Sequence, residues 1–125
     1  MIVTRSALAF EEAVGRLTES IERRGMTMFA RIDHAEGARA VGLELADELV
    51  LVFGNARGGT PLMQSDARIG IELPLRMLIW SEDDGVALGY NDPRELAATY
   101  DVAERQATLE QMAGLLAEIA REAAA

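Results

Sequence analysis

Apolar residues recur at helical spacing in two long segments of the chain. Between residues 10 and 21 they lie three and four positions apart, with charged residues between them, and Gly25 follows as a residue suited to ending a helix. This pattern predicts an amphipathic helix that ends near Arg24. Over residues 102–123 a similar stripe predicts a C-terminal helix that must bury its apolar face against the sheet or a partner. The Ala-rich last five residues are expected to fray.

Five shorter segments have the patterns of strands, and they lie at residues 2–4, 26–33, 48–53, 75–81 and 86–90. The last two flank a Glu-Asp-Asp-Gly turn and therefore predict a hairpin. Residues 34–41 are rich in Ala and contain Gly37, which fits a short helix as well as a loop. Asp92 followed by Pro93 predicts another short helix, because a capping side chain precedes a proline suited to the first turn.

Residues 53–64 join a strand end, a glycine-rich loop and a helix start. Thr60 is the expected helix cap, and Pro61 suits the first helical position. Free N–H groups at such a helix start, with Arg57 nearby, are typical of anion sites. The glycine spacing matches neither the P-loop nor the dinucleotide-binding motif, so an anion site and an ordinary strand-to-helix turn both stay open.

Composition limits the function classes. The chain has 125 residues, half of them apolar, so one domain with its own core is expected. A formal net charge of −9 argues against binding to nucleic acid or to anionic membranes. The absence of cysteine excludes disulfides, thiolate nucleophiles and cysteine-bound metal. No targeting segment and no apolar run of membrane-spanning length is present, so a cytoplasmic protein is the default expectation.

The single histidine, His34, follows Asp33 directly. The pair has suitable chemistry for general acid–base catalysis, but proximity in sequence does not orient the carboxylate toward the ring. A structural or partner-contacting histidine is therefore the favoured interpretation. The spacing of His34 and the nearby acids forms no known ligand set, and we expect neither a metal nor another cofactor. No serine lies in a nucleophile-elbow context.

Other side chains are candidates for a binding site. Asn55 and Asn91 stand at element ends, where such residues usually hydrogen-bond the backbone. Tyr90, at a strand end with Trp80 on the neighbouring strand, is a candidate pocket-lining residue or a core or interface residue. The methionines at positions 26, 28, 63, 77 and 112 fit core positions, although methionine also adapts well at binding surfaces.

Six short motifs between Phe10 and Tyr100 form a pattern that is more specific than any one of them. They are residues 29–35 (FARIDHA), 41–45 (VGLEL), 53–55 (FGN), 59–64 (GTPLMQ), 73–75 (LPL) and 90–93 (YNDP). With these motifs the chain resembles the domain of unknown function 302 family, a group of small bacterial and archaeal α+β proteins. The resemblance implies a single antiparallel β-sheet packed against two main helices, similar to a TATA-binding-protein-like arrangement, and a homodimer.

The family's recurring polar positions, with Arg57 of the glycine loop, give the candidate ligand-binding residues. These are Asp33, His34, Asn55, Arg57, Thr60, Gln64, Tyr90 and Asn91. The resemblance implies no particular reaction. Relatives often carry Arg-His where this chain has Thr99-Tyr100, so a two-histidine metal or haem model does not transfer to it.

Three hypotheses follow. The favoured one is a dimeric binding module for a small anionic or amphipathic ligand, held in a shared pocket built from His34, the loop from Asn55 to Gln64 and the turn at Tyr90 and Asn91. The second is an enzyme that uses His34 as acid or base near the N–H groups of the loop. The third is a purely structural homodimer in which the polar set makes dimer contacts.

Overall fold

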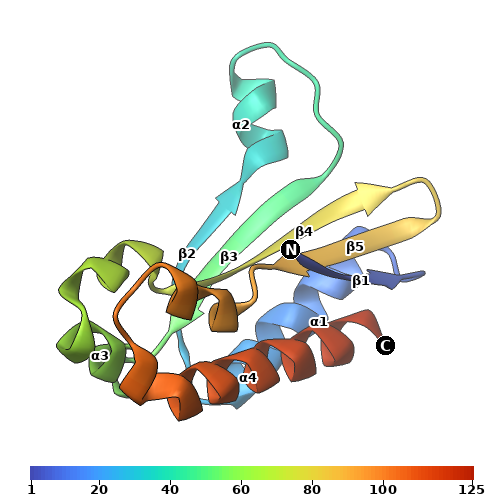
Figure 1. The fold of residues 1–125 in the computed structure, drawn as a ribbon. Coiled ribbons are helices and arrows are strands. Elements are labelled where there is room, and N and C mark those ends of the chain that lie inside the picture. Colours follow the sequence, from blue (N-terminus) through green and yellow to red (C-terminus); the bar gives the residue numbers. More distant parts are fainter.

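The computed structural model describes residues 1–125 and contains five strands, four α-helices and three 3-10 helices (Figure 1). The strands are β1 (Ile2–Ser6), β2 (Thr27–Asp33), β3 (Glu48–Gly54), β4 (Leu75–Glu82) and β5 (Gly85–Tyr90). The helices are α1 (Phe10–Arg23), α2 (His34–Ala40), α3 (Ala56–Ser65), η1 (Ala67–Glu72), η2 (Pro93–Ala98), η3 (Ala103–Arg105) and α4 (Gln106–Ala124). All five predicted strands and both predicted amphipathic helices are therefore present.

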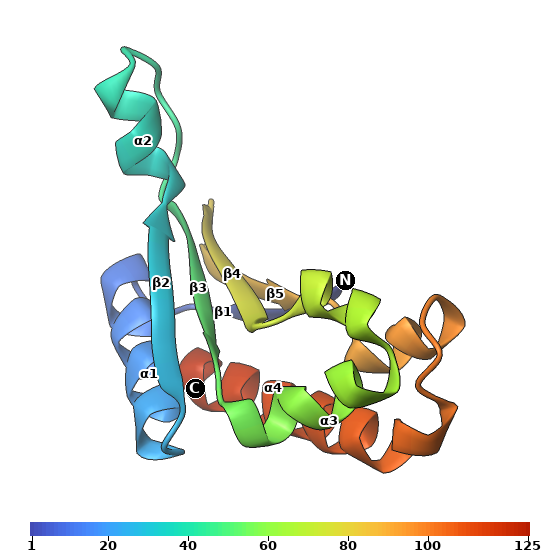
Figure 2. The same cartoon turned by 90° about the vertical axis from the view of Figure 1, so that its left-hand side faces the viewer.

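The five strands form one antiparallel sheet in the order β1-β5-β4-β3-β2. β4 and β5 are the predicted hairpin. Helices α1 and α4 pack side by side on one face of this sheet (Figure 2). This arrangement confirms the expected α+β class with a single antiparallel sheet and two main helices.

Alternate strand residues face the helices and form the main core. In β3 these are Leu49, Leu51 and Phe53, all essentially inaccessible, and they share one cluster with Leu17 and Ile21 of α1. The alternating pattern read from the sequence therefore selects the buried face correctly.

The opposite side of the sheet carries no packed helix (Figure 2). We call it the open face, and the strand registers place the following twelve residues, among others, on it. They are Val3, Arg5, Ala30, Ile32, Glu48, Val50, Val52, Arg76, Leu78, Trp80, Ala87 and Gly89. Most of these side chains are apolar, so the sheet is hydrophobic on both faces although only one is covered.

Helix α3 begins five residues earlier than the sequence predicts. Its cap is Asn55, whose Oδ1 accepts a hydrogen bond from the N–H of Gly58 at 2.8 Å, and Thr60 lies inside the helix. The glycine with positive φ in this stretch is Gly54, just before the cap, so Gly58 and Gly59 are free to be helical. Asn55, at the strand end, caps the first free N–H groups, so the helix starts there and not at Thr60.

Residues 34–41, left open by the sequence, form helix α2 and its end. Asp33 caps this helix by accepting a hydrogen bond from the N–H of Glu36 at 2.9 Å. We call residues 34–47 the arm. It projects from the ends of β2 and β3, away from α1 and α4 (Figures 1 and 2). Apart from its junctions with the strands, the arm is therefore not held by the core.

The C-terminal residues do not fray as expected, because they are anchored. Helix α4 extends to Ala124, and Ala123 is fully buried in the main core. The Ser6 hydroxyl donates to the carbonyl of Ala124 at 2.7 Å, and Arg24 of the α1 end binds Glu122. None of the helices combines the length and the apolar character needed to span a membrane.

Candidate functional site

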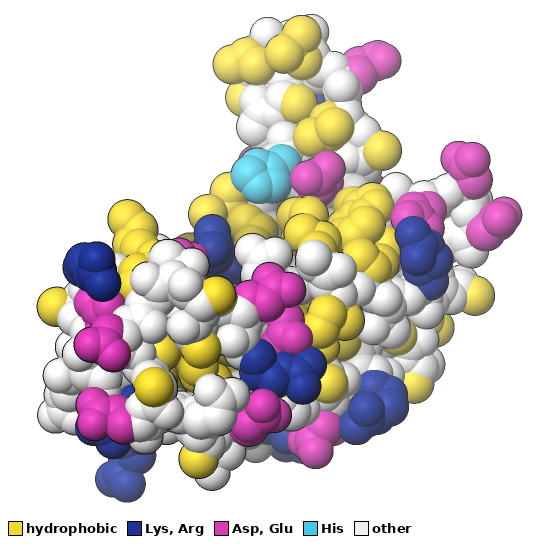
Figure 3. Space-filling view, in the orientation of Figure 1, with side chains coloured by type: hydrophobic (Ala, Val, Ile, Leu, Met, Phe, Trp, Pro, Cys, Tyr) yellow, Lys and Arg dark blue, Asp and Glu magenta, His cyan; other side chains and the backbone are white.

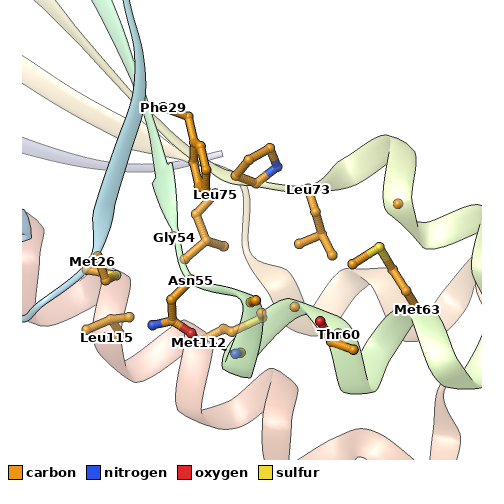
Figure 4. Close-up of a pocket in the computed structure, with 15 residues that line it drawn as sticks. Met26, Phe29, Gly54, Asn55, Thr60, Met63, Leu73, Leu75, Met112 and Leu115 are labelled. Atoms are coloured by element: carbon orange, nitrogen blue, oxygen red, sulfur yellow. Dashed lines mark hydrogen bonds between the residues drawn. The ribbon is translucent and has the colours of Figure 1, made fainter.

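A cavity of about 300 Å³ lies where the sheet ends meet α3, η1 and α4 (Figure 4). We call it the pocket. Its walls are mainly apolar, and the larger apolar side chains that line it are Met26, Phe29, Met63, Leu73, Pro74, Leu75, Met112 and Leu115. These residues come from four separate parts of the chain, so the pocket is formed only by the fold.

Glycines keep the pocket hollow. A Cβ atom at Gly59 would lie 3.4 Å from Leu73 Cδ1 and 3.9 Å from Met63 Cε, both of which belong to pocket-lining side chains. A Cβ at Gly70 would lie 3.3 Å from the Met63 sulfur, and one at Gly58 would lie 3.9 Å from Met112 Cε. Any larger side chain at these positions would therefore occupy the space that now forms the pocket.

Polar side chains line the pocket only at the α3 end, where Asn55 and Thr60 stand (Figure 4). The Asn55 Oδ1 is used in capping, whereas no hydrogen bond within the chain engages its Nδ2. The first-turn N–H groups and the helix dipole add positive partial charge at this end. No titratable side chain lines the pocket. The site thus offers neutral hydrogen bonding at one end and apolar contact elsewhere.

Two of the predicted site residues, Asn55 and Thr60, line the pocket, and two others share their helix. Arg57 and Gln64 are exposed on α3 but do not line it. The glycine motif therefore marks one end of the pocket, whereas Arg57 and Gln64 lie outside its lining.

The Tyr90 and Asn91 turn lies beside the pocket rather than in it. Tyr90 is 5% exposed and belongs to the main core, where burial raises the pKa of its hydroxyl. Asn91 lines a smaller hollow of about 70 Å³, which shares Leu73, Leu75 and Met112 with the pocket as a common wall.

Asp33 and His34 lie at the other end of β2, where the arm begins (Figure 1). The Asp33 carboxylate caps α2, and the exposed His34 makes no hydrogen bond within the chain. Within one chain these two residues do not join the other candidates. The chain also contains no group of three or more His, Asp or Glu side chains that is arranged to hold a metal ion.

An ionic cluster braces the outer wall of the pocket. Asp66 accepts hydrogen bonds from the Arg68 guanidinium and from the N–H of Asp101, and these bonds hold its pKa well below the usual range. The Tyr100 hydroxyl donates to Glu72 at 2.7 Å, which raises the pKa of the tyrosine. These contacts tie η1, which precedes Leu73, to the segment before α4. Tyr100 thus has a bracing role.

The apolar walls were not identified from the sequence as a site. The available signal was the set of methionines, because three of the five in apolar patterns, at positions 26, 63 and 112, line the pocket. Methionine side chains adapt well to binding surfaces, but nothing in the sequence distinguishes a methionine in a pocket wall from one in a core.

Comparison with known proteins identifies relatives over most of the chain. It is 36% identical over 103 residues to a protein named fluoride-specific ion channel FluC 1 from Brucella suis, and 36% identical to proteins of similar name from Brucella abortus and Brucella melitensis. Each match covers 82% of this chain but only 38–41% of the relative. The chain therefore spans about two fifths of the length of these relatives.

The fold has a solved counterpart in an uncharacterized conserved protein from Bacillus stearothermophilus. The two chains share 16% identity, the match covers 98% of this chain and 96% of the other, and the TM-score is 0.87. The model of the family described as domain of unknown function DUF302 matches residues 2–119. With nearly the whole chain covered by the family model, this protein belongs to the DUF302 family, as its motifs indicate.

Proposed function

We propose that this protein is a homodimeric binding module for a small amphipathic molecule, which is held in the pocket. The observation that carries the proposal is the pocket itself. Its walls are apolar side chains, and its two polar side chains, Asn55 and Thr60, both come from the α3 segment. A cavity with a few convergent polar groups in apolar walls is the usual form of a small-molecule site.

The shape and chemistry of the pocket favour a ligand with a short apolar body. Its volume of about 300 Å³ lies at the small end of ligand sites. The rim includes Phe29 and Met63, which are 56% and 38% exposed, so an apolar ligand would cover side chains that now face water. The polar head would lie near the Asn55 Nδ2 and the α3 N-terminus, where the dipole favours an anion or a hydrogen-bond acceptor.

The alternatives have less support. The Brucella relatives are named for fluoride, but no arginine lines the pocket, and apolar walls offer little to a bare anion. An enzyme with His34 as acid or base would need a reacting group near the arm, where the Asp33 carboxylate is already engaged in capping. The purely structural dimer remains the alternative if the pocket binds nothing.

A dye-binding experiment tests the pocket. The fluorescent amphipathic anion 1-anilinonaphthalene-8-sulfonate is titrated into the wild-type protein and two variants. Met63→Glu places a carboxylate in the pocket wall, whereas Ala67→Glu adds the same charge at a nearby exposed position that does not line it. We expect binding to the wild type and to Ala67→Glu, and loss of binding in Met63→Glu. Equal binding to all three proteins would refute the pocket as the site.

Competition with octanoate and octylamine then identifies the head group. Displacement of the dye by octanoate alone supports an acceptor or anion at the α3 end, because the helix dipole disfavours an ammonium there. Displacement by octylamine alone would contradict that orientation. Sedimentation equilibrium of the wild type tests the dimer independently of any ligand.

A further inference from the structure

Exposed large apolar side chains are concentrated in two places on this protein. Four of the nine lie on or at the base of the arm, and three lie around η1 and the pocket rim. The arm set is Ile32, Val41, Leu43 and Leu45. The rim set is Phe29, Met63 and Ile71. Val41 is 72% exposed and Ile71 is 82% exposed, so both sets lack a covering surface within the chain.

The open face connects these two sets. In register across the sheet, Ile32, Val50 and Leu78 form one apolar row, and Trp80 stands in the next row. Figure 3 shows hydrophobic side chains gathered beneath the arm over the strands and again at the arm's tip. An apolar surface therefore runs from the arm over the sheet.

The exposed area of the single chain is larger than its mass predicts. The chain exposes 7123 Å², whereas a compact monomer of 13.5 kDa exposes about 6500 Å². The single chain thus exposes about 600 Å² more than a compact monomer of its mass would. The arm projects from the rest of the chain and so contributes to this excess (Figure 2).

Unpaired charges on the arm are opposite in sign to two unpaired arginines on the body. The arm and the strand residues that flank it, residues 31–48, contain five acids and two arginines, and none of the seven forms an ion pair within the chain. On the body, Arg76 of the open face and Arg57 of α3 also lack an ion-pair partner. An acidic arm segment and these two arginines, which lie toward the opposite end of the strands, suit contact between two copies.

We infer that two copies of this chain pair through the open face, with the arm of each copy docked on the rim set of the other. The arm leaves one end of β2 and β3, while α3 and η1 lie beyond the other end (Figure 2). Consider a two-fold axis that runs perpendicular to the strands and lies in front of the open face. It places the arm end of one copy opposite the α3 end of the other. Each arm tip then meets the partner's η1, and both apolar sets are covered in a closed dimer.

This inference rests on the proposed dimer and gives the arm a function in the binding site. Phe29 and Met63 belong both to the rim set and to the pocket lining, so a docked arm would lie over the pocket mouth. The base of the arm carries His34, and the exchange would bring it toward the pocket of the other copy. The site would then combine His34 from one copy with Asn55 and Thr60 from the other.

Engineered cysteines test the contact directly, because the chain has none of its own. Two single variants, Leu43→Cys at the arm tip and Ile71→Cys on η1, are mixed and oxidised. We expect a disulfide-linked heterodimer in high yield. As a control, Leu43→Cys is mixed with Gln111→Cys, an exposed position on α4 behind the sheet, and this pair should link no more than random collision allows. Equal yields in the two mixtures would overturn the inference.

A second measurement does not depend on cross-linking geometry. Replacing Val41, Leu43 and Leu45 together by Ser removes the apolar tip without touching the core, since all three are exposed. We expect the dimer dissociation constant to rise by about 100-fold in sedimentation. A wild type that is monomeric at high concentration refutes the dimer as well, whereas a dimer unchanged by the substitutions refutes only the arm contact. Binding of the dye to the wild type reports on the pocket separately.

Discussion

Gly59→Ala separates the role of the pocket from the stability of the fold. Gly59 is buried in the interior of α3, and its φ is not positive, so alanine fits the backbone. In a helix interior this change is worth about 0.5–1 kcal/mol of stability, because alanine loses less conformational freedom on folding. For a chain of this length, that gain corresponds to a rise in melting temperature of about 2–4 °C.

The same methyl group should weaken binding. It would lie 3.4 Å from Leu73 Cδ1 and 3.9 Å from Met63 Cε, which makes ordinary to slightly tight contact inside the pocket. The ligand loses the space of about one methylene, which in a fitted apolar site costs roughly tenfold in affinity. If the dye bound to a loosely fitting surface instead, one added methyl group would not change its affinity tenfold.

The assay combines thermal unfolding with titration of 1-anilinonaphthalene-8-sulfonate. Gly15→Ala and Gly114→Ala are matched controls, because both lie in exposed helix positions where a Cβ meets no atom within 4 Å. They should gain similar stability and keep the affinity of the wild type. A lower melting temperature in Gly59→Ala would refute the helical geometry of this glycine. Unchanged affinity would refute the pocket as the place where the dye binds.

Three further predictions concern the framework of the site. Asn55→Ala should lower the free energy of unfolding by about 1 kcal/mol in urea denaturation, while Asn55→Asp should not, because only alanine removes the capping oxygen; equal values for both would contradict the cap. Leu17→Ala, at a fully buried core position, should cost about 2–5 kcal/mol in the same assay, and a loss below 1 kcal/mol would contradict its packing. Glu122 accepts hydrogen bonds from Ser20, Arg24 and Arg23, and the Ser20 bond and the two guanidinium groups hold its pKa below the ordinary 4.5. A carboxyl with a depressed folded-state pKa stabilises the fold above its unfolded pKa and loses that contribution as pH falls. The stability gap between the wild type and Glu122→Gln should therefore be full at pH 7 and close below about 4.5, and a gap independent of pH would refute the assignment.

The elements of the fold were largely predictable because they depend on local patterns. The helix over residues 10–24 and the hairpin at residues 75–90 follow from periodicity and a short turn, and both are present. The start of α3 was misplaced because two capping residues, Asn55 and Thr60, stand five positions apart, and the choice between them depends on whether Gly58 and Gly59 join the helix. The end of α4 was misjudged because its anchors, Ser6 and Arg24, are distant in sequence.

The candidate site was predictable only where it is local. The glycine motif located the α3 end of the pocket, because helix starts and glycines have recognisable sequence signatures. The apolar walls were missed, since Met26, Leu73 and Met112 come together only in the folded chain. A hydrophobic residue in the sequence is compatible with a core, a pocket or an interface, and its exposure alone distinguishes them.

The arm shows the consequence of this ambiguity most clearly. Residues 41–45 form one of the motifs behind the family resemblance, yet their apolar side chains are exposed and contribute nothing to the core of the chain. Leaving Val41 and Leu43 in water gains no folding energy, so packing within one chain does not account for their character. A surface that is apolar and projecting is instead accounted for by association. On that argument the pocket and the arm form one binding site, in which the arm of one copy completes the pocket of the other.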